Sequence, residues 1–178
     1  VASGVRITAL VGDNLFMQAM TVLWIVLITN SFNLLDNMDG LCAGTGAISA
    51  AALSIVAAAS GGAPAALLLA SISGACLGFL KWNLAPARIF LGDAGSQFIG
   101  FLLATLSAAT TYYTYRESPL SVGIPFLIFA IPLYDTASVF WIRFREGRGL
   151  FTGDNSHFSH RIVDLGMSRR QAVGTIHL

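Results

Sequence analysis

Four amide and carboxylate side chains recur every three residues in the stretch NSFNLLDNMDGL, residues 30–41. They are those of Asn30, Asn33, Asp36 and Asp39. Residues three apart in a helix lie on nearly the same side, and Gly40 is a natural place for such a helix to end. Oxygen ligands suit a hard cation such as Mg²⁺, which often takes one or two carboxylates together with substrate phosphates. The alternative is a polar helix end that is only solvated, but charge at the edge of an apolar segment is costly and favours a function.

A single carboxylate, Asp93, lies among small residues in the stretch KWNLAPARIFLGDAGS, residues 81–96. Gly92 precedes it, and Ala94, Gly95 and Ser96 follow it. Small neighbours let backbone N–H groups approach an anion closely and leave the carboxylate free for a metal. A Gly-Asp pair also forms simple turns, so this stretch taken alone does not decide between a turn and a site.

Histidine and arginine gather in a third polar stretch, residues 144–170, where His157, His160 and Arg161 lie close together. On a helical turn these three side chains would face one anionic group. A zinc site is the competing interpretation, although two histidines without a cysteine or a third ligand at suitable spacing favour it little. A solvated basic loop beside a membrane is the other alternative.

One further acid, Asp135, lies well inside an apolar segment. A carboxylate within a membrane span is by default a candidate for function. Hydrogen bonds to Thr136 or Ser138 that help the helices pack would explain it equally well, and both interpretations stay open.

The composition indicates a membrane protein. Hydrophobic residues make up 55% of the chain and charged residues 11%, against about 25% charged in soluble domains, and the mean hydropathy is +0.72. The formal net charge is +1 and the basic residues form no dense tract, so no nucleic-acid partner is expected. Cys42 and Cys76 lie in apolar runs, where thiols behave as small hydrophobic groups, and no disulfide is predicted.

Apolar windows near the length of a membrane span, about 20 residues, predict an all-α, polytopic transmembrane helical bundle. The five windows are Leu15–Leu35, Leu41–Ser60, Pro64–Leu80, Ser96–Tyr115 and Val122–Ile142. A further apolar segment begins after Arg169 and Arg170. We interpret residues 1–178 as a single integral membrane domain that is an internal fragment of a longer protein. The lipid bilayer is therefore expected to surround it.

The basic residues predict the orientation of this bundle. Alternating spans place eight of the ten on one side: Lys81, Arg88, Arg143, Arg145, Arg148, Arg161, Arg169 and Arg170. Arg6 and Arg116 remain on the other side. Because cytoplasmic loops carry an excess of Lys and Arg, the richer side is predicted to face the cytoplasm. All three polar stretches then share that side.

In order and spacing, NSFNLLDNMDGL, ARIFLGDAGS and DNSHFSHR resemble the motifs of the polyprenyl-phosphate N-acetylhexosamine-1-phosphate transferases, the superfamily of the MraY, WecA and TagO enzymes. The resemblance extends from about Gly4 to Met167. It implies transfer of a phospho-sugar from a UDP-N-acetylhexosamine to undecaprenyl phosphate, with release of UMP, at the cytoplasmic face of the bacterial inner membrane. It also implies a requirement for Mg²⁺, with Mn²⁺ as an alternative.

Site roles follow from the same resemblance. Asp93 corresponds to the metal ligand and, with Asp36 and Asp39, to the catalytic carboxylates. Asn30, Asn33 and Asn83 correspond to substrate contacts, and His157, His160 and Arg161 to phosphate-binding residues. The family's Asp-Asp pair is expected upstream of this fragment, so its members have no position here.

The histidine loop departs from the family, because Phe158 and Ser159 separate its two histidines. The stretch Ile-Pro-Leu-Tyr-Asp ending at Asp135 is similar to the WecA and TagO group, which favours UDP-GlcNAc as donor. A secondary transporter that binds a cation through Asp36 and Asp135 is the main alternative. A CDP-alcohol phosphatidyltransferase is disfavoured because no arginine follows Gly40 closely. The sugar, the pathway and the oligomeric state, including a homodimer, are left open.

Overall fold

The computed structural model describes residues 14–115, 122–147, 149 and 157–178, and within them the chain is helical, with no strand. This confirms the all-α prediction. The helices, in chain order, are α1 (Asn14–Leu35), α2 (Leu41–Ala59), α3 (Ala63–Asn83), α4 (Gly92–Tyr115), α5 (Gly123–Ile128), α6 (Ala130–Arg145), α7 (Phe158–Asp164) and α8 (Arg169–Ile176).

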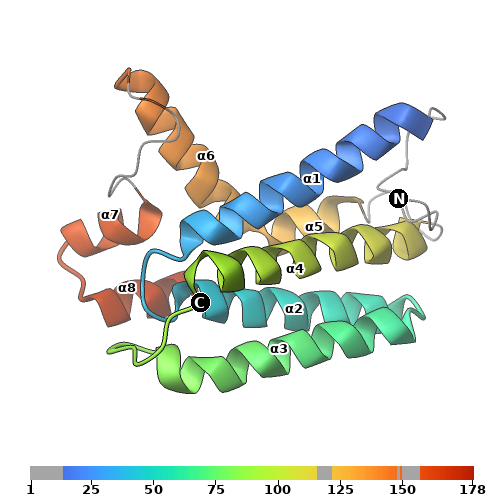
Figure 1. Ribbon diagram of the computed structural model, residues 1–178, viewed down its shortest axis with the longest axis horizontal. Helices are drawn as coiled ribbons and strands as arrows, with labels where there is room; N and C mark the ends of the chain where they lie inside the picture. Colours follow the sequence, from blue (N-terminus) through green and yellow to red (C-terminus); the bar gives the residue numbers. More distant parts are fainter. Residues whose placement is uncertain (1–13, 116–121, 148, 150–156) are drawn as a thin grey trace.

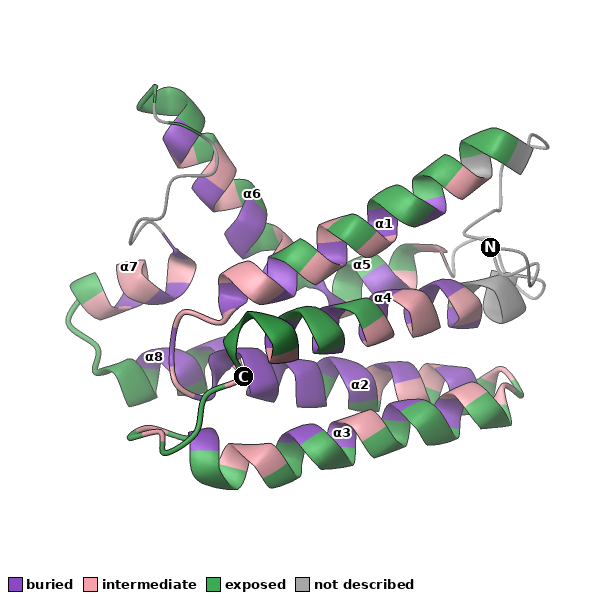
Figure 2. Ribbon diagram, in the orientation of Figure 1, coloured by how far each residue is buried: buried purple, intermediate pink, exposed green. Residues whose placement is uncertain are grey.

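Helix α2 lies at the centre of the bundle. It forms a hairpin with α3, α4 runs beside this pair, and α1 packs across α4 (Figure 1). The first half of α2 is buried almost completely, whereas α3 exposes one whole side (Figure 2). Small residues such as Ala43, Ala47 and Ala50 let the neighbouring helices approach α2 closely.

Three helices are long and apolar enough to cross a membrane, through the stretches Gln18–Leu35, Leu41–Ala59 and Ala63–Asn83. On α3, Leu67, Leu68 and Leu77 point outward, which is expected where the surrounding medium is lipid rather than water. These three helices match the first three predicted spans. Helix α4, predicted as the fourth, has 24 residues but starts earlier than expected and carries Asp93 in its first turn.

The fifth predicted span, Val122–Ile142, is wrong as a single helix, because the chain breaks at Phe129 between α5 and α6. Pro132 lacks the N–H group that would bond to the carbonyl of Ile128 one turn earlier. The hydroxyl of Ser49 donates to that carbonyl instead, at 3.4 Å. Helix α6 then leaves the bundle at a steep angle to α4 (Figure 1).

The segment after Arg169 forms the short helix α8, which begins at a capping box. The hydroxyl of Ser168 accepts from the backbone N–H of Gln171, whose side chain accepts from the N–H of Ser168. Ala172, Val173 and Ile176 pack in a small second core with Leu35 and Leu41. The two short helices α7 and α8 thereby cover the end of the bundle where α1 ends and α2 begins (Figure 1).

Candidate active site

Helix α1 ends at Leu35 rather than near Asp39, so the predicted row of four side chains on one helical face is wrong. The chain turns after Leu35, with the Asp36 N–H on the carbonyl of Asn33 at 3.2 Å and the Asn37 side chain on the carbonyl of Leu34 at 2.9 Å. Gly40, at a φ of +80°, precedes α2 instead of ending α1. A left-handed backbone of this kind favours glycine.

The first two polar stretches meet at Asn33. Its amide nitrogen donates to the carboxylate of Asp93 and to the hydroxyl of Ser96, both at 3.1 Å. Asp93 is exposed in the first turn of α4, where α4 packs against α1. The amide of Asn30 donates to the carbonyl of Val26 in its own helix, at 2.7 Å. The structure therefore brings Asn33 to Asp93 and gives Asn30 no such contact among the described residues.

The charge of Asp93 acts on a second carboxylate at this point, that of Asp36. Burial raises the pKa of Asp36 above its ordinary value, and the nearby charge of Asp93 raises it further. A divalent cation beside them would favour the ionised form of both. Within the described residues no group of three or more His, Cys, Asp or Glu side chains is placed to hold a metal. Mg²⁺ often takes only one or two carboxylates and completes its shell with phosphates and water, so the predicted role of Asp93 as a metal ligand stays a prediction.

The loop between α3 and α4 is attached to the turn after α1 by two side chains. Asn83 is 4% exposed; its oxygen accepts from the N–H of Gly40 at 3.0 Å and its nitrogen donates to the carbonyl of Ile89 at 2.9 Å. Asp39 accepts from the N–H of Ala87 at 3.0 Å. Both residues position the loop that leads to Asp93, and their roles at a substrate stay predictions.

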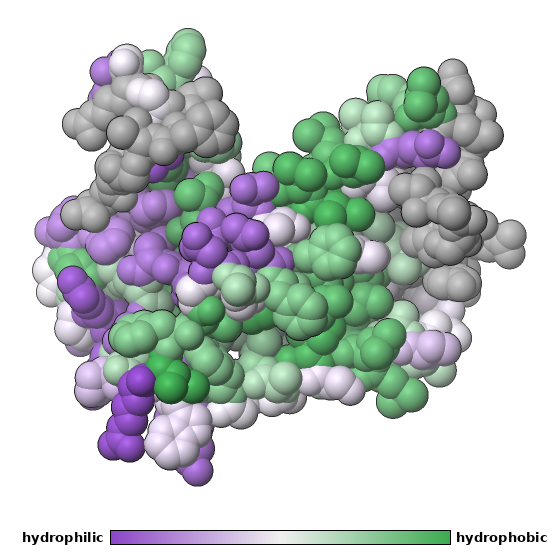
Figure 3. Space-filling view, viewed as in Figure 1, coloured by the Kyte–Doolittle hydropathy of each residue, from purple (hydrophilic) through white to green (hydrophobic). Residues whose placement is uncertain are grey.

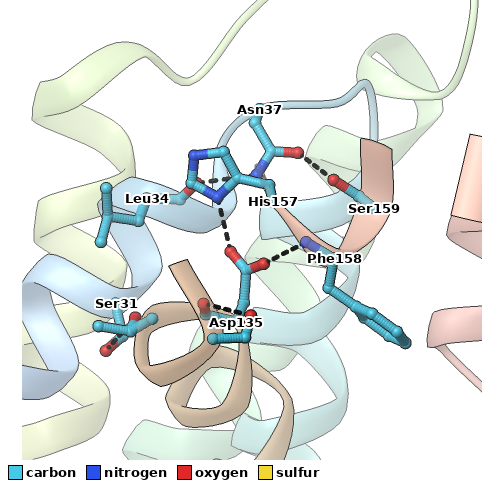
Figure 4. Close-up of polar contacts among 9 residues, drawn as sticks. Ser31, Leu34, Asn37, Asp135, His157, Phe158 and Ser159 are labelled. Carbon is cyan, nitrogen blue, oxygen red and sulfur yellow. Dashed lines mark hydrogen bonds and ion pairs between the residues drawn. The ribbon is translucent and has the colours of Figure 1, made fainter. Parts of the chain in front are cut away.

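The described part of the histidine loop, from His157 onward, is attached to α6 and to the turn after α1 (Figure 4). His157 Nδ1 lies 2.8 Å from a carboxylate oxygen of Asp135, whose other oxygen accepts from the N–H of Phe158 at 2.6 Å. The hydroxyl of Ser159 donates to the Asn37 side chain at 2.6 Å. Asn37 and Ser159 were not among the predicted site residues, because only their meeting in space distinguishes them from ordinary polar residues.

The carboxylate of Asp135 thus bonds neither of the neighbours that a packing role suggested. The hydroxyl of Thr136 donates to Ser31 at 2.9 Å, and that of Ser138 donates to the backbone carbonyl of Asp135 at 3.0 Å. The acid is directed to the histidine loop instead.

The predicted common direction of His157, His160 and Arg161 holds only in part. His157 precedes α7 in extended conformation, and the centre of its ring lies 6.4 Å from that of His160. Arg161 lies over the ring of Phe158, at 6.0 Å. Burial lowers the pKa of His160, and electrostatic interactions with His157 and Arg169 lower it further against the opposing effects of Asp164 and Asp135.

Hydrophilic side chains gather at the end of the bundle where α1 ends and α4 begins, while the neighbouring face of α1 and α4 is hydrophobic (Figure 3). Apolar helices with amides, carboxylates and histidines collected at one end define a helical membrane protein with a polar site at the boundary of its spans. Residues 4–111 match the glycosyl transferase family 4 profile. The chain belongs to this family, as the resemblance of its motifs predicted.

Three relatives illustrate the similarity. A "Probable undecaprenyl-phosphate N-acetylglucosaminyl 1-phosphate transferase" of Bacillus subtilis is 36% identical, over 89% of this chain and 44% of the relative. A decaprenyl-phosphate N-acetylglucosaminephosphotransferase of Mycobacterium tuberculosis is 34% identical over the same shares. An undecaprenyl-phosphate alpha-N-acetylglucosaminyl 1-phosphate transferase of Escherichia coli is 33% identical over 84% of this chain and 41% of the relative. The chain thus spans less than half of each.

Proposed function

We propose that the protein containing this chain transfers N-acetylglucosamine 1-phosphate from UDP-GlcNAc to undecaprenyl phosphate at the cytoplasmic face of the bacterial inner membrane. An oxygen of the lipid phosphate would attack the phosphorus that carries the sugar. The bond from that phosphorus to the bridging oxygen would break, and UMP would leave with the electron pair. The contact of Asn33 with Asp93 carries this proposal, because it joins the two motifs that would surround the diphosphate.

Asp93 would hold Mg²⁺, with Mn²⁺ as the alternative, and the electrostatic effect of Asp93 on the neighbouring Asp36 supports a cation at this point. When bound, the cation would neutralise charge on the diphosphate, which is the main catalytic demand of phosphoryl transfer. Asn33 would orient the carboxylate of Asp93 through its amide donor. Histidine and arginine of the third stretch would donate to phosphate oxygens, and the apolar helices would admit the lipid acceptor.

The contacts of Asp135 weigh against the transporter alternative, which needs Asp135 as one of its two cation-binding carboxylates. Both carboxylate oxygens of Asp135 already accept a hydrogen bond, from His157 and from the backbone of Phe158. A coupling cation would have to bind beside these two donors at a carboxylate that is only 1% exposed. Asp36 alone leaves the meeting of Asn33, Asp93 and the histidine loop unexplained.

The function is tested with full-length protein in detergent, radiolabelled UDP-GlcNAc and undecaprenyl phosphate. We expect label in the lipid fraction and release of UMP, both dependent on added Mg²⁺. UDP-MurNAc-pentapeptide serves as the competing donor. Lipid labelling from that donor alone would contradict the proposed sugar, and no labelling from either would contradict the proposed reaction.

A further inference from the structure

The buried contact between Asp135 and His157 has no assigned part in the transfer chemistry. We propose that Asp135 is a positioning residue, which fixes the tautomer and the direction of the His157 ring so that Nε2 is the atom presented to the substrate diphosphate. The role of Nε2 rests on the proposed function. The tautomer itself depends only on the contacts around Asp135.

Among the described residues, each oxygen of the Asp135 carboxylate has one partner. Asp135 is 1% exposed and His157 is 6% exposed, so water competes little for either group. One oxygen meets His157 Nδ1 at 2.8 Å, and the other accepts the backbone N–H of Phe158 at 2.6 Å. This contact links residues 22 positions apart in the sequence and joins α6 to the start of α7.

These contacts select one tautomer. An ionised carboxylate only accepts hydrogen bonds, and a neutral imidazole carries its proton on one nitrogen. Nδ1 must therefore donate to Asp135, which leaves Nε2 free of the proton in the neutral ring and able to donate in the protonated ring. The second ring nitrogen of His157 points away from Asp135 (Figure 4).

The residues that follow His157 are also fixed by hydrogen bonds. The N–H of Phe158 is bound to Asp135, and the next side chain, Ser159, is bound to Asn37 at 2.6 Å. Asn37 belongs to the turn that carries Asp36, and it bonds to the last turn of α1 through Leu34. The position of the His157 ring is thus set relative to α1 and α6 together.

Stability alone is a weak explanation for this pair. Replacing a buried ion pair by apolar groups of similar volume is often neutral or stabilising, because removing both charges from water is costly. A buried carboxylate in contact with a histidine at the edge of a polar site instead resembles a carboxylate that orients a histidine for its work on a substrate.

The test uses ¹⁵N-histidine NMR of the full-length protein in nanodiscs, with the His157 signal assigned through His157→Gln. We expect the Nδ1–H form in the wild type and a population of the Nε2–H form in Asp135→Asn. Ser138→Ala is the matched control. Ser138 lies one helical turn after Asp135 and bonds to its backbone carbonyl rather than to its carboxylate, so this variant should leave the spectrum unchanged. A wild type in the Nε2–H form, or an unchanged Asp135→Asn spectrum, would overturn the proposal even if no transfer activity were found.

Kinetics supply the second readout. We expect Asp135→Asn to lower kcat about tenfold or more, since a wrong tautomer is costly, with a smaller change in KM, and Asp135→Glu to recover part of the loss. In the His157→Gln background Asp135→Asn should cost less than about twofold, because coupled residues do not act additively. Losses that multiply in the double variant would show that Asp135 acts on something other than His157.

Discussion

Asn33 decides where the carboxylate of Asp93 points. One amide nitrogen donates to Asp93 and to Ser96, so three side chains from two helices share a single hydrogen-bonding centre. Asp93 is exposed and has no such anchor in its own helix among the contacts described. At the residue scale, the site depends on a neutral side chain that orders a charged one.

Replacing Asp93 tests the proposed metal ligand directly. Asp93→Asn keeps the shape of the side chain and removes the charge, so we expect Mg²⁺-dependent turnover to be lost. The melting temperature should stay near that of the wild type because Asp93 is exposed. Activity close to wild type would show that another group holds the metal.

Replacing Asn33 tests the orientation of that ligand. Asn33→Ala removes the donor from Asp93, and loss of a group that orients a metal ligand costs about 10- to 100-fold in metal affinity or activity. We expect the Mg²⁺ concentration for half-maximal turnover to rise by that factor. Ser71→Ala, whose hydroxyl bonds only within α3 on an exposed surface, serves as control. Equal Mg²⁺ requirements in both variants would remove Asn33 from the site.

At the element scale, close packing of α1 on α4 is what brings Asn33 to Asp93. Gly100 of α4 lies directly against the backbone of α1: a Cβ atom there would lie 2.9 Å from the Cα of Thr29 and 3.0 Å from the Cβ of Phe32. A Cα atom, and a Cβ atom bonded directly to the backbone, cannot give way as the end of a flexible side chain can. The distance between these two helices therefore depends on the absence of one methyl group.

The variant Gly100→Ala should force α1 and α4 apart. Overpacking of this kind costs about 1–3 kcal/mol, so we expect a lower melting temperature and, because the site is built across this contact, weaker Mg²⁺-dependent activity. Gly78→Ala is the matched control, since a Cβ at Gly78 of α3 meets nothing within 4 Å. If both variants melt alike, the α1–α4 contact is looser than the structure indicates.

Helix α8 is held against α2 by His177, whose ring rests on Gly44 and lies 3.3 Å from the carbonyl of Leu41. Burial lowers the pKa of His177 below its ordinary value of 6.5, and the hydrogen bond to Leu41 opposes this only in part. The unfolded chain thus binds the proton more tightly than the folded one. Stability is then full above the ordinary histidine pKa and declines as the pH falls below it.

Comparing melting temperatures at about pH 8 and about pH 5 tests this linkage. We expect the wild type to lose more stability on acidification than His177→Gln, which has no proton to gain at that position. The contribution of His160, whose pKa is also lowered, is common to both proteins. An equal loss of stability in the two proteins would show that the pKa of His177 is the same in the folded and the unfolded protein.

At the scale of the whole molecule, hydrophilic side chains collect at the end of the bundle where α1 ends and α4 begins (Figure 3). The hairpin between α2 and α3 lies at the other end (Figure 1). Ala59 is exposed near that hairpin, and Leu165 is exposed between α7 and α8. The two ends should therefore face opposite sides of the membrane.

Cysteine labelling in cells tests this arrangement. Both native cysteines are buried, so the background of a membrane-impermeant maleimide should be low. We expect Ala59→Cys to react in intact cells and Leu165→Cys to react only after the membrane is opened, since the basic loops are predicted to be cytoplasmic. The reverse pattern would place the site outside the cytoplasm.

Much of the fold follows from local composition. Long apolar runs, punctuated by Gly61, Gly62 and Pro64, predicted α1, α2 and α3 because in lipid a backbone must satisfy its hydrogen bonds within a helix. The same information predicted the end of α1 wrongly. The Asn37 side chain bonds to the carbonyl of Leu34, and Asp39 bonds to the N–H of Ala87 in a distant loop, and both contacts favour a turn over further helix. The break at Phe129 was missed although Pro132 was its visible cause.

The sequence by itself determined which side chains are available and on which side of the membrane they are expected, because hydropathy and the distribution of charge are properties of short segments. Only the tertiary structure decided which of them meet: Asn33 with Asp93 across 60 residues, and Asp135 with His157 across 22. Such contacts depend on how closely two helices approach each other. For α1 and α4, this distance depends on Gly100, which lies on the facing helix. The residue pattern of one segment does not predict which distant segment it will contact.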